Sequence, residues 1–530
     1  MKAKLLKAAG IIGALTLVSR ILGMTRDILS AKGFGTTWQW DAFIYAFMLP
    51  NFMRRLVGEG ALTSAFIPVY TDIREKKGEE AAFQFANVIY TLLFWGLLGF
   101  LVVVAGALFL LQKIPSLPPV VHLTCELLQI FFPYLFFIAL CALAGGILNC
   151  HQRFFSPALN PIILDIVWIF AVLWVSKLTD LPPEKRVFWL SVWIFASGAM
   201  QLGIQIPSLL HTGYKPRFEF DFSHPGLRQV AKLILPAILG FAVMQLNILV
   251  DTTMAFWIGA GANSSLWYGN RLMQFPLGVF AIAMGTALLP AISHHTARNE
   301  IEEAKKSLSF ALRSIFFIIL PSTVGLIVLR TPIVRLLFER GEFDAASTAR
   351  TAFVVLCYTI GLFAYSGQKL VVTGFYSLQD TRTPMKVGAV TLILNIVLNL
   401  LLMGPLKEGG LALATSMAGI VNFVSLLYLY HRRISGFPVK ELISSSLKIL
   451  AASLVMGGFA WQFYQWIDSH MGWGVTMRLL VGVLGSVALS LPIYVGFCFL
   501  LRVPEIQEAL RWIRKSQTSK MAGSVGEEPL

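Results

Sequence analysis

Charged side chains are scarce in this sequence of 530 residues: they make up 13% of it, against 56% hydrophobic residues. The mean hydropathy is +0.71, which excludes a soluble globular protein of this length. Apolar runs long enough to cross hydrocarbon recur along the whole chain. The runs are continuous and do not alternate in short segments, which excludes a transmembrane β-barrel. The pattern predicts an all-α polytopic membrane protein.

Sequence patterns for metal, nucleotide or disulfide chemistry are also missing. The five cysteines are scattered and have no spacing typical of disulfides or metal ligands. The eight histidines form no HExxH pattern, and there is no GxxxxGK(S/T) loop to bind ATP. No soluble segment is long enough to hold a catalytic site. We therefore predict a transporter without a cofactor, and not an enzyme.

The net charge of +15 allows two explanations. In a soluble protein it would suggest nucleic acid as a partner, whereas in a membrane protein Lys and Arg collect in cytoplasmic loops. If the N-terminus is cytoplasmic, the segments on that side hold 21 Lys and Arg residues and the opposite segments hold 10. This bias predicts that both termini are cytoplasmic and that no nucleic acid is bound. Fourteen spans are predicted, at residues 5–32, 41–70, 82–111, 121–149, 156–177, 187–210, 229–259, 264–293, 308–329, 348–375, 385–403, 409–430, 443–467 and 474–501.

An internal repeat relates the two halves of the chain. Asp27 and Asp251 are 224 residues apart, and Pro50 and Pro276 are 226 residues apart. Because each repeat holds six spans, we expect two lobes related by a pseudo-two-fold axis along the membrane normal, with the binding site between them. The predicted domains are an N-terminal lobe at 1–220, a C-terminal lobe at 221–435, a C-terminal helix pair at 436–502 and a cytoplasmic tail at 503–530.

Charged residues inside the first span mark a candidate site, because a charge in the bilayer is costly and is kept for function. Arg20 and Asp27 share one helix face with small residues, and Arg26 lies about 120° away from it. This face is expected to line a cavity. The alternative for Arg26 and Asp27 is a structural ion pair at the outer interface.

The second span adds further charges: Asp41 at its outer end and, beyond Pro50, Arg54, Arg55 and Glu59. Arg55 and Glu59 are four residues apart on a helix and can neutralise each other, which leaves Arg54 to bind a ligand. The alternative is a purely structural network of buried salt bridges.

Two isolated basic residues lie in later spans, Arg271 in the eighth and Lys369 in the tenth. Lys369 could instead extend its ammonium group to the inner interface. With the arginines of the first two spans, they give the expected cavity a surplus of positive charge. Since arginine suits fork-like binding of phosphate oxygens, a diphosphate would fit this cavity.

A separate polar set offers carboxylate, amide and hydroxyl oxygens: Asp251, Asn395, Asn399 and Thr415. Such oxygens suit a hard cation, so a sodium site is predicted there. The alternative is ordinary hydrogen bonding between membrane helices.

Four stretches carry a family resemblance: "SRILGMTRD", "DAFIYAFMLPNFMRRLVGEGALTSAFIPV", "GNRLMQFPLGVFAIAMGTALLP" and "GFYSLQDTRTP". They resemble the MurJ (MviN) family of lipid II flippases, in the MOP superfamily of exporters, and the likeness covers roughly residues 5–500. The resemblance implies fourteen helices in two six-helix lobes, a V-shaped cavity and alternating access. It also implies that the last two spans form a groove for a polyprenyl tail.

The resemblance assigns roles to individual residues. The essential cavity arginines of the family match Arg20, Arg26, Arg54 and Arg271, and its acids match Asp27 and Asp41. Sodium-binding positions of some members are similar to Asp251, Asn395, Asn399 and Thr415. The chain departs from the family at Asn270, Gln274 and Asn399, where many relatives have acids. Asn270 and Gln274, near Arg271, leave the expected cavity more positive, and Asn399 removes an acid from the predicted sodium site.

The resemblance and the buried charges together favour a flippase of the bacterial inner membrane. It would move lipid II from the cytoplasmic to the outer leaflet for cell-wall synthesis, driven by sodium or the membrane potential. Expected partners are lipid II, the membrane and other proteins of cell-wall synthesis or division. The first alternatives are a flippase for another polyprenyl-diphosphate oligosaccharide and a MATE-like drug exporter. The cavity of a drug exporter should be acidic, whereas the cavity expected here is basic. A membrane enzyme would need clustered acids, and a division scaffold would have no use for buried arginines.

Overall fold

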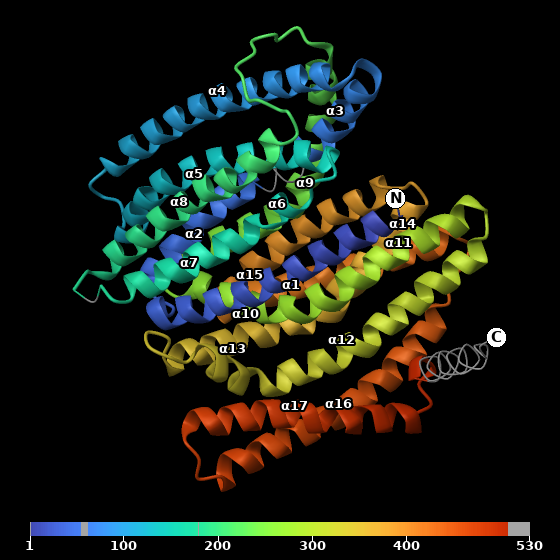
Figure 1. Ribbon diagram of the computed structural model, residues 1–530. Coiled ribbons are helices and arrows are strands. Elements are labelled where there is room, and N and C mark those ends of the chain that lie inside the picture. Colours follow the sequence, from blue (N-terminus) through green and yellow to red (C-terminus); the bar gives the residue numbers. More distant parts are fainter. Residues whose placement is uncertain (1, 55–61, 179, 507–530) are drawn as a thin grey trace, which may run out of the picture. The chain divides into compact units, whose positions relative to one another are not determined.

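The computed structural model describes residues 2–54, 62–178 and 180–506. These residues form helices joined by short connections, and no strand occurs among them (Figure 1). The predicted all-α class is therefore confirmed. The elements are α1 (Lys2–Phe34), α2 (Trp38–Met53), α3 (Thr63–Lys77), α4 (Glu79–Gln112), α5 (Pro119–Cys150), α6 (Phe155–Ala158), α7 (Asn160–Val175), α8 (Pro183–Leu210), α9 (Pro225–Ile258), α10 (Ala262–Pro276), the π-helix η2 (Leu277–Ala281), α11 (Ile282–Ala297), α12 (Ile301–Phe338), α13 (Ala345–Ile360), α14 (Leu362–Ser377), α15 (Arg382–Arg433), α16 (Val439–His470) and α17 (Val475–Leu500).

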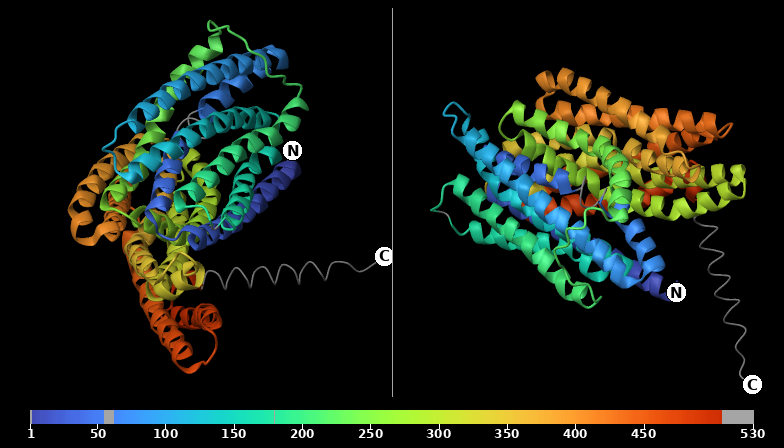
Figure 2. Two further views of the ribbon diagram at one scale, coloured as in Figure 1. Left: turned by 90° about the vertical axis from the view of Figure 1, so that its left-hand side faces the viewer. Right: turned by 90° about the horizontal axis from the view of Figure 1, so that it is seen from above.

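The chain divides into two compact units. Unit 1 comprises Met1–Trp267 and Arg340–Ser347, and unit 2 comprises Tyr268–Glu339 and Thr348–Leu530. In unit 1, α5 packs against α2, α4 and α8, and α7 contacts both α1 and α8 (Figure 1). In unit 2, α16 and α17 form a hairpin that packs on α12, and α14 packs against α11 and α15 (Figures 1 and 2). The predicted boundaries of the lobes stay a prediction.

The long apolar helices identify a polytopic membrane protein. Among the described residues, eight helices are long and apolar enough to cross a membrane, or nine if α13 and α14 count as one bent span. The most apolar 18-residue stretch of α4 has no buried residue, as expected for a helix face that contacts lipid. The number of fourteen spans stays a prediction.

Three predicted spans contain more than one helical element. The span at 41–70 is divided into α2 and α3, and the span at 264–293 into α10, η2 and α11. The span at 348–375 is bent by 40° between α13 and α14. Pro50 and Pro276 lie in the last turn of α2 and α10, where proline lacks the N–H that the helix uses and its ring clashes with the preceding turn.

The two halves of the chain repeat the same order of helical elements and prolines. In the first half, α2 ends soon after Pro50, the next helix contains Pro68, and a long helix follows from Glu79. In the second half, α10 ends at Pro276, α11 contains Pro290, and the long α12 follows. The sequence repeat therefore corresponds to a repeat of local structure.

The connection after α12 belongs to unit 1, where it docks on the end of α1. The Glu342 N–H donates to the Lys32 carbonyl at 3.0 Å. Gly35 and Gly341 have φ angles of +57° and +62°, in the left-handed region that favours glycine. A Cβ atom on Gly35 would overlap the Glu342 carbonyl, and one on Gly341 would overlap the Lys32 carbonyl. Close approach of the two backbones therefore requires both glycines.

The segment that follows α17 is anchored inside unit 2 through Glu505. The Ser445 hydroxyl lies 2.8 Å from Glu505 Oε2, and Arg313 Nη1 lies 3.6 Å from Glu505 Oε1. Replacing Glu505 by alanine is expected to lower the unfolding free energy by about 1.5–3 kcal/mol, the value of a hydrogen bond to a charged group. Unfolding in detergent by urea measures this, with the exposed Glu441→Gln as control. Equal stability of the two variants would contradict the anchor.

Candidate functional site

The charged residues of α1 lie in two environments. Arg20 is exposed, as are Gly13 and Thr16 on the same face. Arg26 and Asp27 are buried, with exposed fractions of 6% and 2%. The helix face that Arg20 and Asp27 share is therefore exposed at Arg20 and buried at Asp27.

The buried part of α1 packs against α7 in unit 1. Small and polar residues recur along α1 in steps of four and three: Ser19, Gly23, Arg26 and Ser30. This spacing places them on one side of the helix. On α7, Asp165 and Trp168 are three residues apart and also share one side. The two stripes meet, because Ser19 Oγ donates to Asp165 Oδ2 at 3.2 Å and Trp168 Nε1 donates to Ser30 Oγ at 3.2 Å.

Arg26 is held by two carboxylates and one aromatic ring. Its Nη1 donates to Asp165 Oδ1 at 2.8 Å, while Nη2 and Nε donate to Asp27 Oδ1 at 2.9 and 3.1 Å. The guanidinium carbon lies 4.6 Å from the centre of the Trp168 ring, a cation–π geometry. The ion pair of Arg26 with Asp27, left open by the sequence, is therefore present and buried.

Asp165 is the residue that sequence analysis missed. It is 4% exposed and lies in an otherwise apolar run, "NPIILDIVW". An acid within a membrane span is itself a signal of function or of a buried partner, and that signal could have identified Asp165. Its partner could not be read from spacing, because Arg26 is 139 residues earlier in the chain.

Asp41 lies on α2, and its buried carboxylate contacts the N-terminus of α10 within unit 1. Its carboxylate accepts hydrogen bonds from the Gly261 N–H, from the Ser264 N–H at 2.7 Å and from the Ser264 hydroxyl. An acid at a helix N-terminus satisfies N–H groups that lack helical partners and is favoured by the helix dipole. Asp41 therefore ties α2 to α10. It also borders a pocket of about 420 Å³ with Trp38 and Phe256.

The other predicted cavity residues are distributed over both units. In unit 1, Arg54 is half-buried directly after α2, and its Nε donates to Asn51 Oδ1 at 2.9 Å. In unit 2, Arg271 is half-buried on α10 and Lys369 is exposed on α14. Glu59 and its predicted pairing with Arg55 lie outside the described residues. The side chains of Asn270 and Gln274 are joined by a hydrogen bond from Gln274 Nε2 to Asn270 Oδ1.

The predicted sodium ligands are also divided between the units. Asn395, Asn399 and Thr415 lie in unit 2 and form a chain of hydrogen bonds: Asn399 Nδ2 to Asn395 Oδ1 at 3.0 Å, and Asn395 Nδ2 to Thr415 Oγ1 at 3.2 Å. A non-helical backbone at Lys407 within α15 brings these residues together. Asp251 lies in unit 1, on α9. The described residues contain no group of three or more His, Cys, Asp or Glu side chains able to hold a metal. Sodium binding stays a prediction.

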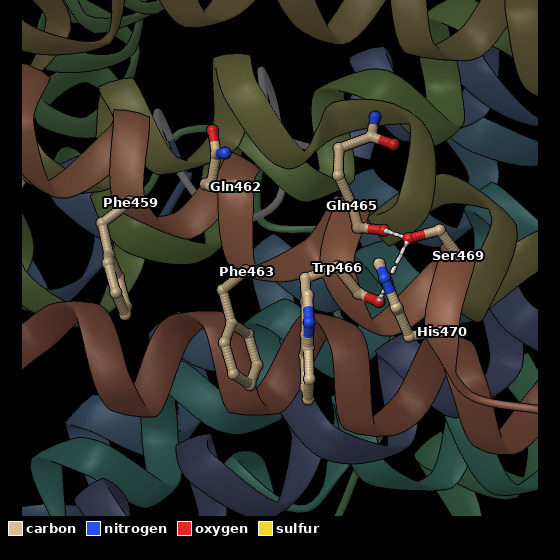
Figure 3. A pocket seen from close by; sticks show the side chains of 7 residues that line it. All are labelled: Phe459, Gln462, Phe463, Gln465, Trp466, Ser469 and His470. Atoms are coloured by element: carbon tan, nitrogen blue, oxygen red, sulfur yellow. Dashed lines mark hydrogen bonds between the residues drawn. The ribbon is translucent and has the colours of Figure 1, made fainter.

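An open groove of about 450 Å³ follows the C-terminal half of α16 in unit 2 (Figure 3). Its aromatic side is continuous, since Phe463 and Trp466 have ring centres 6.3 Å apart and Trp466 stacks on His470 at 5.7 Å. Gln462 and Gln465 supply polar groups at its edge. The groove belongs to the helix pair for which the resemblance implies a lipid tail.

Comparison with known proteins identifies the relatives of this chain. The profile of the family described as "Lipid II flippase MurJ" matches residues 30–483. A "Probable lipid II flippase MurJ" of Vibrio cholerae is 32% identical over 514 residues, covering 94% of this chain and 97% of the relative. The "Lipid II flippase MurJ" of Burkholderia cenocepacia is 30% identical over 482 residues, covering 88% of this chain and 91% of the relative.

Solved structures agree with these sequence matches. A "Lipid II flippase MurJ, inward closed conformation" has a TM-score of 0.75 at 28% identity and covers 92% of this chain and 99% of that chain. An inward-facing multidrug resistance MATE family transporter of the MOP superfamily has a TM-score of 0.64 at 14% identity, covering 79% of this chain and 94% of that chain. The second likeness concerns the fold alone. The chain therefore belongs to the MurJ family of lipid II flippases.

Proposed function

We propose that this protein moves lipid II from the cytoplasmic to the outer leaflet of the bacterial inner membrane by alternating access. The observation that carries the proposal is the family match over residues 30–483. Relatives described as lipid II flippases align over almost their whole length, including 97% of the Vibrio cholerae protein. The substrate is a polyprenyl diphosphate that bears a sugar-peptide headgroup, and it supplies the precursor for cell-wall synthesis.

Arginines are the proposed ligands of the diphosphate. Arg20 is exposed, and Arg54 and Arg271 are half-buried, so each has part of its side chain accessible. The planar guanidinium group binds phosphate oxygens through two parallel hydrogen bonds. Arg26 differs from these three, because its guanidinium binds Asp27 at 2.9 Å and Asp165 at 2.8 Å and is buried.

The orientation and the lipid tail complete the proposal. Both termini are placed in the cytoplasm, which is supported by the ratio of 21 to 10 Lys and Arg residues on the two sides. The polyprenyl tail lies along α16 and α17, supported by exposed apolar side chains such as Leu454, Leu484 and Val487. Other proteins of cell-wall synthesis or division are further proposed partners.

The driving force is proposed to be the membrane potential or a sodium gradient. Moving one elementary charge across 100 mV supplies about 2.3 kcal/mol. Sodium would use the polar set of Asn395, Asn399 and Thr415, and the hydrogen bonds among their side chains would have to rearrange around the ion.

Flipping of fluorescent lipid II by the purified protein in proteoliposomes tests the proposal. Combined Arg20→Ala, Arg54→Ala and Arg271→Ala substitutions are expected to reduce the rate at least about tenfold, the cost of one lost charge-assisted hydrogen bond. Lys113→Gln, a change at an exposed residue beyond the end of α4, is the matched control and should flip at the normal rate. An unchanged rate in the triple variant would refute the role of these arginines, and no flipping by the natural sequence would refute the function.

A further inference from the structure

We propose that Asp165 is a positioning residue for lipid II transport, a counter-anion that the substrate diphosphate displaces from Arg26. This inference rests on the proposed function, because it takes the diphosphate as the competing anion. Asp165 matches none of the motifs that indicate the family, and its role follows from contacts within unit 1.

Both hydrogen-bonding edges of the Arg26 guanidinium are occupied. Asp27 takes the edge formed by Nε and Nη2, at 3.1 and 2.9 Å, and Asp165 takes Nη1 at 2.8 Å. The Trp168 ring covers one face of the guanidinium at 4.6 Å. A phosphate can therefore bind Arg26 with two parallel hydrogen bonds only after a carboxylate has left.

The two carboxylates differ in which helix carries them. Asp27 follows Arg26 directly on α1, so the two move together in any displacement of that helix. Asp165 belongs to α7, and its contact with Arg26 is a link between two helices. A shift of α1 along α7 therefore breaks the contact with Asp165 and leaves the contact with Asp27 in place. Asp165 is the carboxylate that the diphosphate can replace.

Asp165 is itself held in place for this exchange. Ser19 Oγ donates to Asp165 Oδ2, while Oδ1 accepts from Arg26. The Cβ position of Gly23 lies 3.7 Å from Asp165 Oδ2, so a larger side chain at residue 23 would crowd the carboxylate. The residues that the α1 stripe presents to Asp165 therefore hold its carboxylate in one orientation.

Replacing Asp165 by asparagine separates positioning from simple stability. The amide oxygen can still accept from Arg26 and the amide NH2 group can donate to the Ser19 hydroxyl, but the negative charge that competes with the diphosphate is lost. We expect the affinity for undecaprenyl diphosphate to rise about tenfold, since one charge-assisted contact no longer has to be displaced. Flipping should become slower, because the anion is released less readily.

The experiment uses the full chain in phosphatidylcholine nanodiscs for binding and in proteoliposomes for flipping, with undecaprenyl diphosphate as the binding probe. Asp165→Asn is expected to bind the probe more tightly and to flip lipid II more slowly. Asp165→Glu keeps the negative charge, so its affinity and flipping rate are expected to stay close to those of the natural sequence. The matched control is Gln205→Leu, which removes another hydrogen bond to α7, the partly buried one from Gln205 Nε2 to Asn160 Oδ1 at 3.0 Å. It should lower the melting temperature without changing the affinity.

Two outcomes decide the proposal. Unchanged or weaker binding by folded Asp165→Asn would overturn it, whereas absence of binding by the natural sequence would instead refute the proposed function. If Asp165→Asn does not fold, Ser19→Ala replaces it, because this change removes one hydrogen bond from Asp165 and keeps the charge balance. A smaller gain in affinity is expected for Ser19→Ala, and an unchanged dissociation constant would overturn the proposal.

Discussion

Arg26→Ala is expected to lower the free energy of unfolding by about 3–5 kcal/mol, the cost of removing one partner from a buried ion pair. Asp27 and Asp165, exposed by only 2% and 4%, would remain buried without the guanidinium that binds them. The contact with the Trp168 ring would be lost as well. Urea or thermal unfolding of the protein in detergent measures the effect.

A second substitution tests whether uncompensated charge is the cause. Asp165→Asn in the Arg26→Ala background removes one of the two carboxylates, so we expect it to recover part of the lost stability. Arg20→Ala is the control, because Arg20 is exposed and its replacement should stay within about 0.5 kcal/mol. If the double variant is no more stable than Arg26→Ala, the two carboxylates are not what destabilises that variant. Loss of flipping in Arg26→Ala is therefore meaningful only beside a measurement of folding.

Asp41→Ala is expected to have the second largest effect, a loss of at least about 3 kcal/mol. It removes the acceptor of three hydrogen bonds from Gly261 and Ser264. A hydrogen bond to a charged group contributes about 1.5–3 kcal/mol, and three bonds that share one carboxylate do not add in full. Asp41→Asn keeps one carbonyl oxygen and should lose less. Flipping should fall in both variants, because α10 also carries Arg271. Unfolding and flipping measured on the same samples test both expectations.

The control for Asp41 is an acid of similar type in an exposed pair. Asp72 lies 2.8 Å from Lys76, and both side chains are largely in solvent. Asp72→Asn should therefore change stability by less than about 0.5 kcal/mol, as exposed ion pairs contribute little. Equal losses for Asp72→Asn and Asp41→Ala would mean that the helix start does not depend on Asp41.

The sequence predicts the helices well because each apolar run must be long enough to cross hydrocarbon, and that length is visible in the chain. The positions where helices end or bend are harder to predict. Pro50 marks the end of α2, but the bend between α13 and α14 occurs at Gly361, with no proline. There the backbone approaches Ser416, and a Cβ on Gly361 would lie 2.8 Å from the Ser416 Cα. Such contacts depend on which helices pack together, which spacing within one helix does not reveal.

The candidate site shows the same limit. Helical periodicity placed Arg20 and Asp27 on one face, but exposure along that face depends on α7. Asp41 was expected to be a cavity acid, and nothing in its own span indicated that Gly261 and Ser264 would surround it. The family resemblance predicts which charges matter. The contacts that show how they are held come only from the folded chain.

The docking of the α12–α13 connection on α1 has a consequence for protein engineering. The chain passes between the two units three times, after Trp267, after Glu339 and after Ser347. A single cut therefore cannot release two self-sufficient halves, since a fragment ending at Trp267 lacks the backbone that pairs with Lys32. Split-protein reporters and fragment complementation should therefore not divide this chain after residue 267 or within residues 340–347.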